Sequence, residues 1–124
     1  MRLLIADDSD ILRSRIMQRL IEIKRIDIVG EAKDISEVIR ANEALNPDIL
    51  ILDIRMPGGN GISALAAIKK DKKRKPIIIV FTNYPYFQYR KKCIDLGADF
   101  FFYKALEFEK LIELLEKLAQ SHQR

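Results

Sequence analysis

Five polar side chains stand at the ends of apolar segments, where a side chain can leave a protein core and reach water. They are Asp7 and Asp8 after residues 3–6, Asp53 after residues 49–52, Thr82 after residues 77–81, and Lys104 after residues 99–103. A carboxylate in such a place can be a nucleophile, a metal ligand or both. Three carboxylates brought together repel one another and favour a hard cation such as Mg²⁺. A hydroxyl and an ammonium group beside them would bind phosphoryl oxygens, which suits phosphoryl transfer.

The apolar segments are predicted to be the strands that bring these side chains together. Residues 49–52 form an uninterrupted apolar run that ends in turn-forming residues, as in a strand buried on both faces. Residues 3–6, 26–31, 77–81 and 99–103 are the other strand candidates. Apolar residues at helical spacing separate the strands, so the order is strand, helix, five times over. This pattern predicts an α/β fold with a five-stranded parallel sheet covered by helices on both faces.

Two of the predicted helices carry specific expectations. In the first, Leu12, Ile16 and Leu20 recur at helical spacing and are expected to face the core, with Arg13 among the polar positions. The fourth is expected to begin at Pro85 and end before Gly97, with Tyr86 and Tyr89 on its inner side.

Length and composition limit the class of protein. The chain has 124 residues, a net charge of +4 and one cysteine, Cys93, which predict a single domain over residues 1–124 in the reducing cytoplasm. No apolar run is long enough to span a bilayer, so we expect no membrane partner. Six cations in residues 69–75 account for much of the positive charge, and such a run is typical of a solvated helix end. No nucleic-acid-binding motif accompanies it, so direct nucleic-acid binding is not expected.

The polar residues at the strand ends resemble those of the receiver domains of two-component response regulators. The resemblance rests on Asp7-Asp8-Ser9, on residues 53–57 with Gly61, on Thr82, and on residues 97–99 leading to Lys104. It covers essentially the whole chain and implies a flavodoxin-like (βα)5 fold with strand order 2-1-3-4-5. It also implies a switch that is activated by phosphorylation and is not an enzyme.

The resemblance assigns a role to each of these residues. Asp53 would accept a phosphoryl group from a histidine kinase or a histidine phosphotransfer protein, while Thr82 and Lys104 hold the phosphoryl oxygens. Mg²⁺ would be bound by Asp8, Asp53 and the backbone carbonyl of Arg55, with Asp7 acting largely through water. Thr82 and Phe101 would form the conformational switch. The signal would pass to a protein target or a second copy of the chain through helix 4, strand 5 and helix 5.

Three features depart from the family pattern. Ala105 follows Lys104 where the family usually has a proline after a cis bond, which affects where the lysine ammonium can reach. Asn83 is larger than the residue usual after the threonine and is expected to crowd the site. Aromatic residues are concentrated in residues 84–89, and not all of them can face inward on one helix, so some are expected at the surface. They either form a partner or dimer contact or simply close an edge of the core.

Three other interpretations remain open from the sequence. A phosphatase of the haloacid-dehalogenase type uses a similar aspartate, but it places a second aspartate two residues later, where Arg55 stands here. A flavodoxin could bind a phosphate at residues 58–61, although Asp53 would repel it. A receiver fold without phosphorylation could serve purely as a binding module.

Overall fold

The computed structural model describes residues 1–84 and 86–121 and contains a five-stranded parallel sheet. Its strands are β1 (Arg2–Ala6), β2 (Asp27–Ala32), β3 (Ile49–Leu52), β6 (Ile77–Thr82) and β7 (Phe100–Tyr103). They lie in the order β2-β1-β3-β6-β7, and neighbouring strands pair in parallel. Counted among themselves the strands have the order 2-1-3-4-5, so the predicted fold class and strand order are confirmed.

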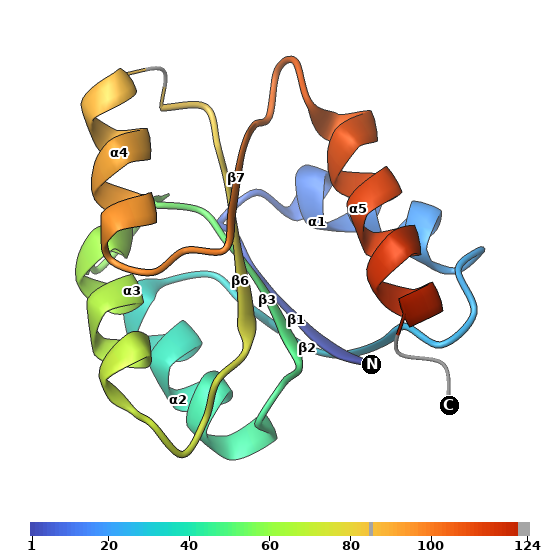
Figure 1. Cartoon of the computed structure of the whole chain (residues 1–124), viewed down its shortest axis with the longest axis horizontal. Helices are drawn as coiled ribbons and strands as arrows, with labels where there is room; N and C mark the ends of the chain where they lie inside the picture. The colour runs from blue at the N-terminus through green and yellow to red at the C-terminus, as the bar shows by residue number, and fades with distance from the viewer. Residues whose placement is uncertain (85, 122–124) are drawn as a thin grey trace.

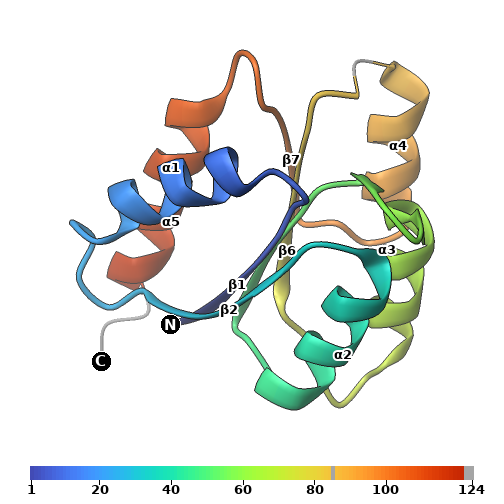
Figure 2. The ribbon, with the colours of Figure 1, turned by 180° about the vertical axis from the view of Figure 1, so that it is seen from behind.

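Five helices cover the two faces of this sheet. They are α1 (Asp10–Leu20), α2 (Ile35–Leu45), α3 (Gly61–Lys70), α4 (Phe87–Asp95) and α5 (Phe108–Ser121). α1 and α5 lie on one face, and α2, α3 and α4 lie on the other (Figures 1 and 2). Side chains of β3 enter two separate cores, with Leu50 and Leu52 on the α2–α4 side and Ile49 and Ile51 on the α1–α5 side. The continuous apolar run therefore reflects a central strand that is buried on both faces.

The helix ends follow local signals in the sequence. The Ser9 hydroxyl accepts a hydrogen bond from the backbone N–H of Leu12 and caps α1. α2 ends at Asn46, whose φ of 48° is left-handed, a conformation that asparagine tolerates. α4 is followed by Gly97 at a φ of +106°, so the predicted glycine stop is confirmed.

The structure corrects the beginning of the fourth helix. α4 starts at Phe87, and Tyr86 is its N-cap residue with 53% of its surface exposed, so the expectation that Tyr86 faces the core is wrong. Tyr86 precedes the first helical turn and therefore does not share the inner stripe that the half-buried Tyr89 and the buried Cys93 form at i and i+4. Pro85, the predicted first residue of this helix, lies outside the described residues.

The glycine-rich segment after β3 is more ordered than the sequence indicated. It contains a short antiparallel pair, β4 (Arg55–Met56) and β5 (Gly59–Asn60), that was not predicted. Pro57 and Gly58 form its turn, and Gly58 and the following Gly59 have φ values of +87° and +144°, which a residue with a side chain rarely adopts. This hairpin leads directly into α3, so the segment that follows Asp53 is paired with itself up to the first residue of that helix.

Candidate functional site

The carboxyl ends of four strands bring the predicted site residues to one edge of the sheet. Backbone hydrogen bonds continue the sheet one residue beyond three of these strands. The N–H of Asp53 donates to the carbonyl of Ala6 at 2.9 Å, and the N–H of Lys104 donates to the carbonyl of Thr82 at 2.9 Å. The N–H of Asp7 likewise donates to the carbonyl of Ala32 at 2.9 Å. Asp7, Asp53 and Lys104 are therefore held by the sheet itself, at the edge where open α/β folds bind ligands.

Lys104 contacts two buried carboxylates at this edge. Its Nζ lies 2.7 Å from Oδ2 of Asp53 and 2.6 Å from Oδ2 of Asp7. Only 14% of the lysine side chain is exposed, and the two carboxylate side chains are 5% and 3% exposed. Within residues 1–84 and 86–121 no peptide bond is cis, so Lys104 is followed by a trans bond and its ammonium nevertheless reaches Asp53.

Three carboxylates converge beside that ammonium. Oxygen atoms of Asp7, Asp8 and Asp53 all lie within 4.8 Å of one another, with Asp8 exposed to solvent and the other two buried. One ammonium cannot balance three carboxylates, and a set of oxygen donors around an excess of negative charge suits a hard divalent cation. The residues present therefore fit Mg²⁺.

Burial and pairing shift the titration of two of these groups. Burial raises the pKa of Asp7 above its usual value, and its contacts with Lys104 and with the N–H of Ser9 offset only part of this. Burial lowers the pKa of Lys104, but the charges and hydrogen bonds of Asp53 and Asp7 outweigh it and raise that pKa overall. Lys104 is therefore firmly protonated and serves as the resident counter-charge of the buried acids.

Backbone N–H groups orient the acids as well. The N–H of Ser9 donates to Oδ1 of Asp7 at 2.8 Å, and the N–H of Arg55 donates to Oδ1 of Asp53 at 3.1 Å. The loop after Asp53 also has a steric requirement at Gly61. A Cβ there would lie 2.3 Å from Cα of Ile54, closer than real Cβ atoms come to other atoms. Gly61 is therefore needed for α3 to begin directly over the Asp53 loop.

Thr82 ends β6, the strand next to β3, and is fully buried. Its hydroxyl accepts a hydrogen bond from the N–H of Tyr84 at 3.3 Å. The exposed Asn83 lies with Lys104 and Ala105 in the wall of a surface pocket of about 340 Å³. The structure thus brings Thr82 and Lys104 to one edge with Asn83 beside the lysine, while the crowding predicted for Asn83 stays a prediction.

Phe101 lies inside the core and is 4% exposed. The ring of Tyr103 meets it edge-on at 5.2 Å, and the guanidinium of Arg90 on α4 lies 5.5 Å from its centre. Phe101 therefore connects β7 with α4, which is the position a packing switch requires, while movement of this ring stays a prediction.

The aromatic residues after β6 form a cluster that is partly exposed, as expected. The rings of Tyr84 and Tyr89 lie 4.2 Å apart, and the ring of Tyr86 lies 5.3 Å from that of Tyr84. The guanidinium of Arg55 lies 4.9 Å from the Tyr84 ring and so links the Asp53 loop to this cluster. Phe87 is 71% exposed at the start of α4.

The position of Arg13, like that of Tyr86, differs from the one expected from the sequence. Arg13 was expected on the polar face of α1, but it is 4% exposed and hydrogen-bonds to the backbone carbonyl of Asp7. The signal that could have revealed it is spacing, because Arg13, Ile16 and Leu20 are separated by three and four residues and share one helical stripe.

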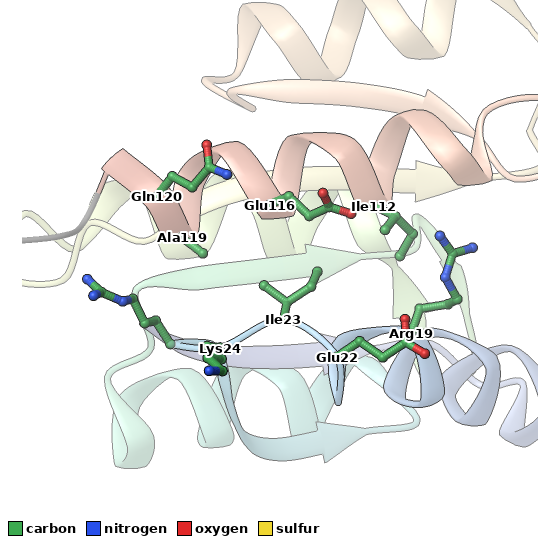
Figure 3. A pocket seen from close by; sticks show the side chains of 9 residues that line it. Arg19, Glu22, Ile23, Lys24, Ile112, Glu116, Ala119 and Gln120 are labelled. Carbon is green, nitrogen blue, oxygen red and sulfur yellow. The ribbon is translucent and has the colours of Figure 1, made fainter.

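A second pocket lies away from this edge and contains none of the predicted site residues. It has a volume of about 420 Å³ and lies between α5 and the segment that follows α1 (Figure 3). Ile23 and Ile112 face it together with charged side chains of both signs, among them Lys24 and Glu116 (Figure 3). Nothing in this lining resembles a site for chemistry, so the carboxyl edge remains the candidate site.

The fold and the edge define a class of small α/β domains that combine an acidic pocket with a lysine at the carboxyl ends of a parallel sheet. Residues 3–116 match the family described as the response regulator receiver domain, and the chain belongs to that family. Receiver domains are phosphorylation-dependent switches of two-component signalling and are generally not enzymes. The interpretations as a haloacid-dehalogenase-type phosphatase or a flavodoxin are thereby replaced.

Known relatives and structures agree with this assignment. The chain is 34% identical over 116 residues to the DNA-binding transcriptional activator EvgA of Escherichia coli K12, covering 94% of this chain and 56% of the relative. Among solved structures, the isolated receiver domain of RcsB from Salmonella enterica, determined with the phosphomimetic BeF3⁻, has a TM-score of 0.88 at 29% identity. That match covers 100% of this chain and 91% of the RcsB domain.

A second similar structure is the CheX–CheY–BeF3⁻–Mg²⁺ complex of Borrelia burgdorferi. Its TM-score is 0.83 at 28% identity, covering 95% of this chain and 88% of the other. The chain spans about half the length of the curated relatives it matches. Among the described residues, no helix is long and apolar enough to cross a membrane.

Proposed function

We propose that Asp53 is the phosphoacceptor of this receiver domain and takes its phosphoryl group from the phosphohistidine of a histidine kinase or a histidine phosphotransfer protein. The observation that carries this proposal is the contact of 2.7 Å between the ammonium of Lys104 and the buried carboxylate of Asp53, inside the three-carboxylate cluster. In the reaction one carboxylate oxygen of Asp53 bonds to phosphorus as the bond from phosphorus to the histidine nitrogen breaks. The product is an acyl phosphate on Asp53 and a free imidazole.

The residues around Asp53 would prepare this transfer. Lys104 and the N–H of Arg55 each bond one of its carboxylate oxygens, which fixes the orientation of the nucleophile. The Lys104 ammonium would then bind a phosphoryl oxygen, as would the hydroxyl of Thr82 once it leaves the N–H of Tyr84.

Mg²⁺ would be held by Asp8, Asp53 and the backbone carbonyl of Arg55, with Asp7 acting largely through water. The bound ion would neutralise negative charge on the phosphoryl group as it transfers. Support comes from the convergence of the carboxylates within 4.8 Å and from the Mg²⁺ and BeF3⁻ present in the structure of the related CheX–CheY complex.

Phosphorylation would be read out through Thr82 and Phe101 on the face formed by α4, β7 and α5. Phe101 contacts Arg90 of α4, so movement of its ring would shift the packing of that helix. Exposed apolar side chains lie at the end of this face that is next to the carboxyl ends of the strands. Phe87 at the start of α4 is 71% exposed, and Leu106 between β7 and α5 is 85% exposed. Such residues suit contact with a protein target or with a second copy of the chain.

The remaining expectations belong to the same proposal. Residues 1–124 form one receiver domain that works in the cytoplasm as a switch and not as an enzyme. EvgA is named as DNA-binding, but this chain matches 56% of its length, so we assign no direct nucleic-acid contact to the receiver domain itself. Any such contact in a longer protein would belong to another part.

Intact-mass analysis after incubation with acetyl phosphate tests the proposal. We expect a gain of one phosphoryl group that requires Mg²⁺ and disappears in the Asp53→Asn variant. The matched control is Asp95→Asn, which removes an exposed carboxylate paired with Lys91 on α4 and should leave the gain unchanged. If neither acetyl phosphate nor a phosphorylated histidine phosphotransfer protein modifies the folded wild-type protein, the domain is a binding module and the proposal fails.

A further inference from the structure

Arg13 on α1 is a buried cation that the phosphoacceptor chemistry does not use. Its side chain is 5% exposed, although ordinary arginines on a short helix reach solvent. Three groups satisfy the guanidinium. Nη1 donates to the backbone carbonyl of Asp7 at 2.5 Å, Nε donates to Oε1 of Glu31 at 2.8 Å, and Nη2 bonds Oδ1 of Asp10.

The bond to the Asp7 carbonyl completes the fixation of that residue. The N–H of Asp7 bonds Ala32, its Oδ1 accepts from the N–H of Ser9, and its Oδ2 contacts Lys104. With Arg13 on the carbonyl, both polar backbone atoms and both carboxylate oxygens of Asp7 have a partner. The carbonyl of Asp7 and the N–H of Asp8 belong to one planar peptide unit, so Arg13 also fixes the direction in which the chain enters Asp8.

Asp8 has the weakest support of the three clustered acids. It is exposed, whereas Asp7 and Asp53 are buried and bonded to Lys104. Its position depends on the backbone before it, which Arg13 holds, and on the start of α1 after it. A small rotation of the peptide between Asp7 and Asp8 would move the Asp8 carboxylate away from the other two.

Packing alone does not account for an arginine here. Arg13 shares the inner stripe of α1 with Ile16 and Leu20, where an apolar side chain would avoid the desolvation cost of a buried charge. Only a guanidinium offers several donors in a fixed plane, so that one side chain can hold a carbonyl and two carboxylates at once. Glu31 at the end of β2 and Asp10 at the start of α1 lock that plane in turn.

We propose that Arg13 is a positioning residue that sets the Mg²⁺ affinity of the acidic cluster by fixing the peptide between Asp7 and Asp8. It touches neither the ion nor the phosphoryl group, and it acts through the backbone carbonyl of Asp7. The inference rests on the proposed function, because it assumes that Asp8 binds the metal. Partners of this kind around metal ligands typically contribute 10- to 100-fold to metal affinity.

The test compares Mg²⁺ binding in Arg13→Met, Arg13→Lys and wild-type protein, measured by the shifts of backbone amide NMR signals during a Mg²⁺ titration. We expect the Mg²⁺ dissociation constant of Arg13→Met to rise about tenfold or more. Arg13→Lys should also bind more weakly than wild type, because one ammonium cannot hold the carbonyl and Glu31 together. The matched control is Arg19→Met on the same helix, which removes an ion pair with Glu109 of α5 and should leave Mg²⁺ affinity unchanged.

Phosphorylation by acetyl phosphate provides the second readout. At saturating Mg²⁺ the rate of Arg13→Met should return to within about threefold of wild type, because only metal binding is weakened. If Arg13→Met does not fold, Arg13→Lys carries the test. Wild-type Mg²⁺ affinity in both variants, or a rate defect that saturating Mg²⁺ does not restore, would overturn the inference. Failure of the wild-type protein to bind Mg²⁺ would instead refute the proposed function.

Discussion

Replacing Lys104 by methionine should test how the acidic cluster is held together without a metal. The ammonium lies 2.6 and 2.7 Å from two carboxylates in a part of the chain where all three side chains are at least 86% buried. Removing one partner of such a group leaves buried charge uncompensated, which costs about 3–5 kcal/mol. We therefore expect Lys104→Met to lower the free energy of unfolding by roughly that amount at pH 7 without divalent cations.

Lys91 provides a control with the same chemistry and almost the same distance. Its ammonium lies 2.7 Å from Oδ2 of Asp95, but these side chains are 65% and 58% exposed. Exposed pairs at i and i+4 contribute only about 0.3–0.5 kcal/mol, so Lys91→Met should have little effect on stability. The contact distances are nearly equal, so the difference between the two variants measures burial together with the second carboxylate that Lys104 contacts.

Urea unfolding with and without Mg²⁺ gives the assay. Mg²⁺ should stabilise Lys104→Met more than wild type, because the ion supplies the missing positive charge and displaces no ammonium. The pH dependence of the stability that Lys104 provides follows from its raised pKa. Burial lowers this pKa, and the contacts with Asp53 and Asp7 raise it by more. The contribution of Lys104 is complete below the usual lysine value of 10.5 and is lost as pH rises through the folded-state pKa. Equal costs for Lys104→Met and Lys91→Met, or equal stabilisation of wild type and Lys104→Met by Mg²⁺, would refute the reasoning.

Three further predictions concern this edge of the sheet and the core beside it. Burial raises the pKa of Asp7 above 3.8, so the folded state favours the protonated carboxyl and loses stability as pH rises through that pKa. Asp7→Asn should therefore be more stable than wild type at pH 7 in urea unfolding, and this gain should disappear towards pH 3. Gly61→Ala should cost about 2–3 kcal/mol and slow phosphorylation, because its Cβ would lie 2.3 Å from Cα of Ile54, whereas Ser63→Ala on the exposed side of α3 should do neither. Phe101→Ala should cost about 3–5 kcal/mol in thermal or urea unfolding, and a cost below about 1 kcal/mol would show that this ring is not packed in the core.

The sequence by itself determined the architecture and the residues at the edge. Uninterrupted apolar runs such as Ile49–Leu52 indicated buried parallel strands, and amphipathic segments between them indicated covering helices. In a parallel sheet all strands end at the same edge, so the polar residue after each apolar run had to lie near the others. Asp7, Asp8, Asp53 and Lys104 could be grouped for this reason before any distance was known, and the structure brings them together.

Tertiary structure decided what local patterns leave open. Polarity alone placed Arg13 at the surface, although its spacing from Ile16 and Leu20 is a local signal of burial. The acceptors that hold it inside, the carbonyl of Asp7 just after β1 and the carboxylate of Glu31 on β2, are brought to it by the packing of α1 on the sheet. The prediction for Tyr86 was wrong because α4 begins one residue after it, at Phe87, so Tyr86 does not share the helical stripe that faces the core. Two further features depend on how the loops pack. They are the contact between Lys104 and Asp53, which forms although the bond after Lys104 is trans, and the hairpin after Asp53. The ends of the apolar runs determine which residues share an edge, because parallel strands end together, whereas the pairing of their side chains is set by packing and burial in three dimensions.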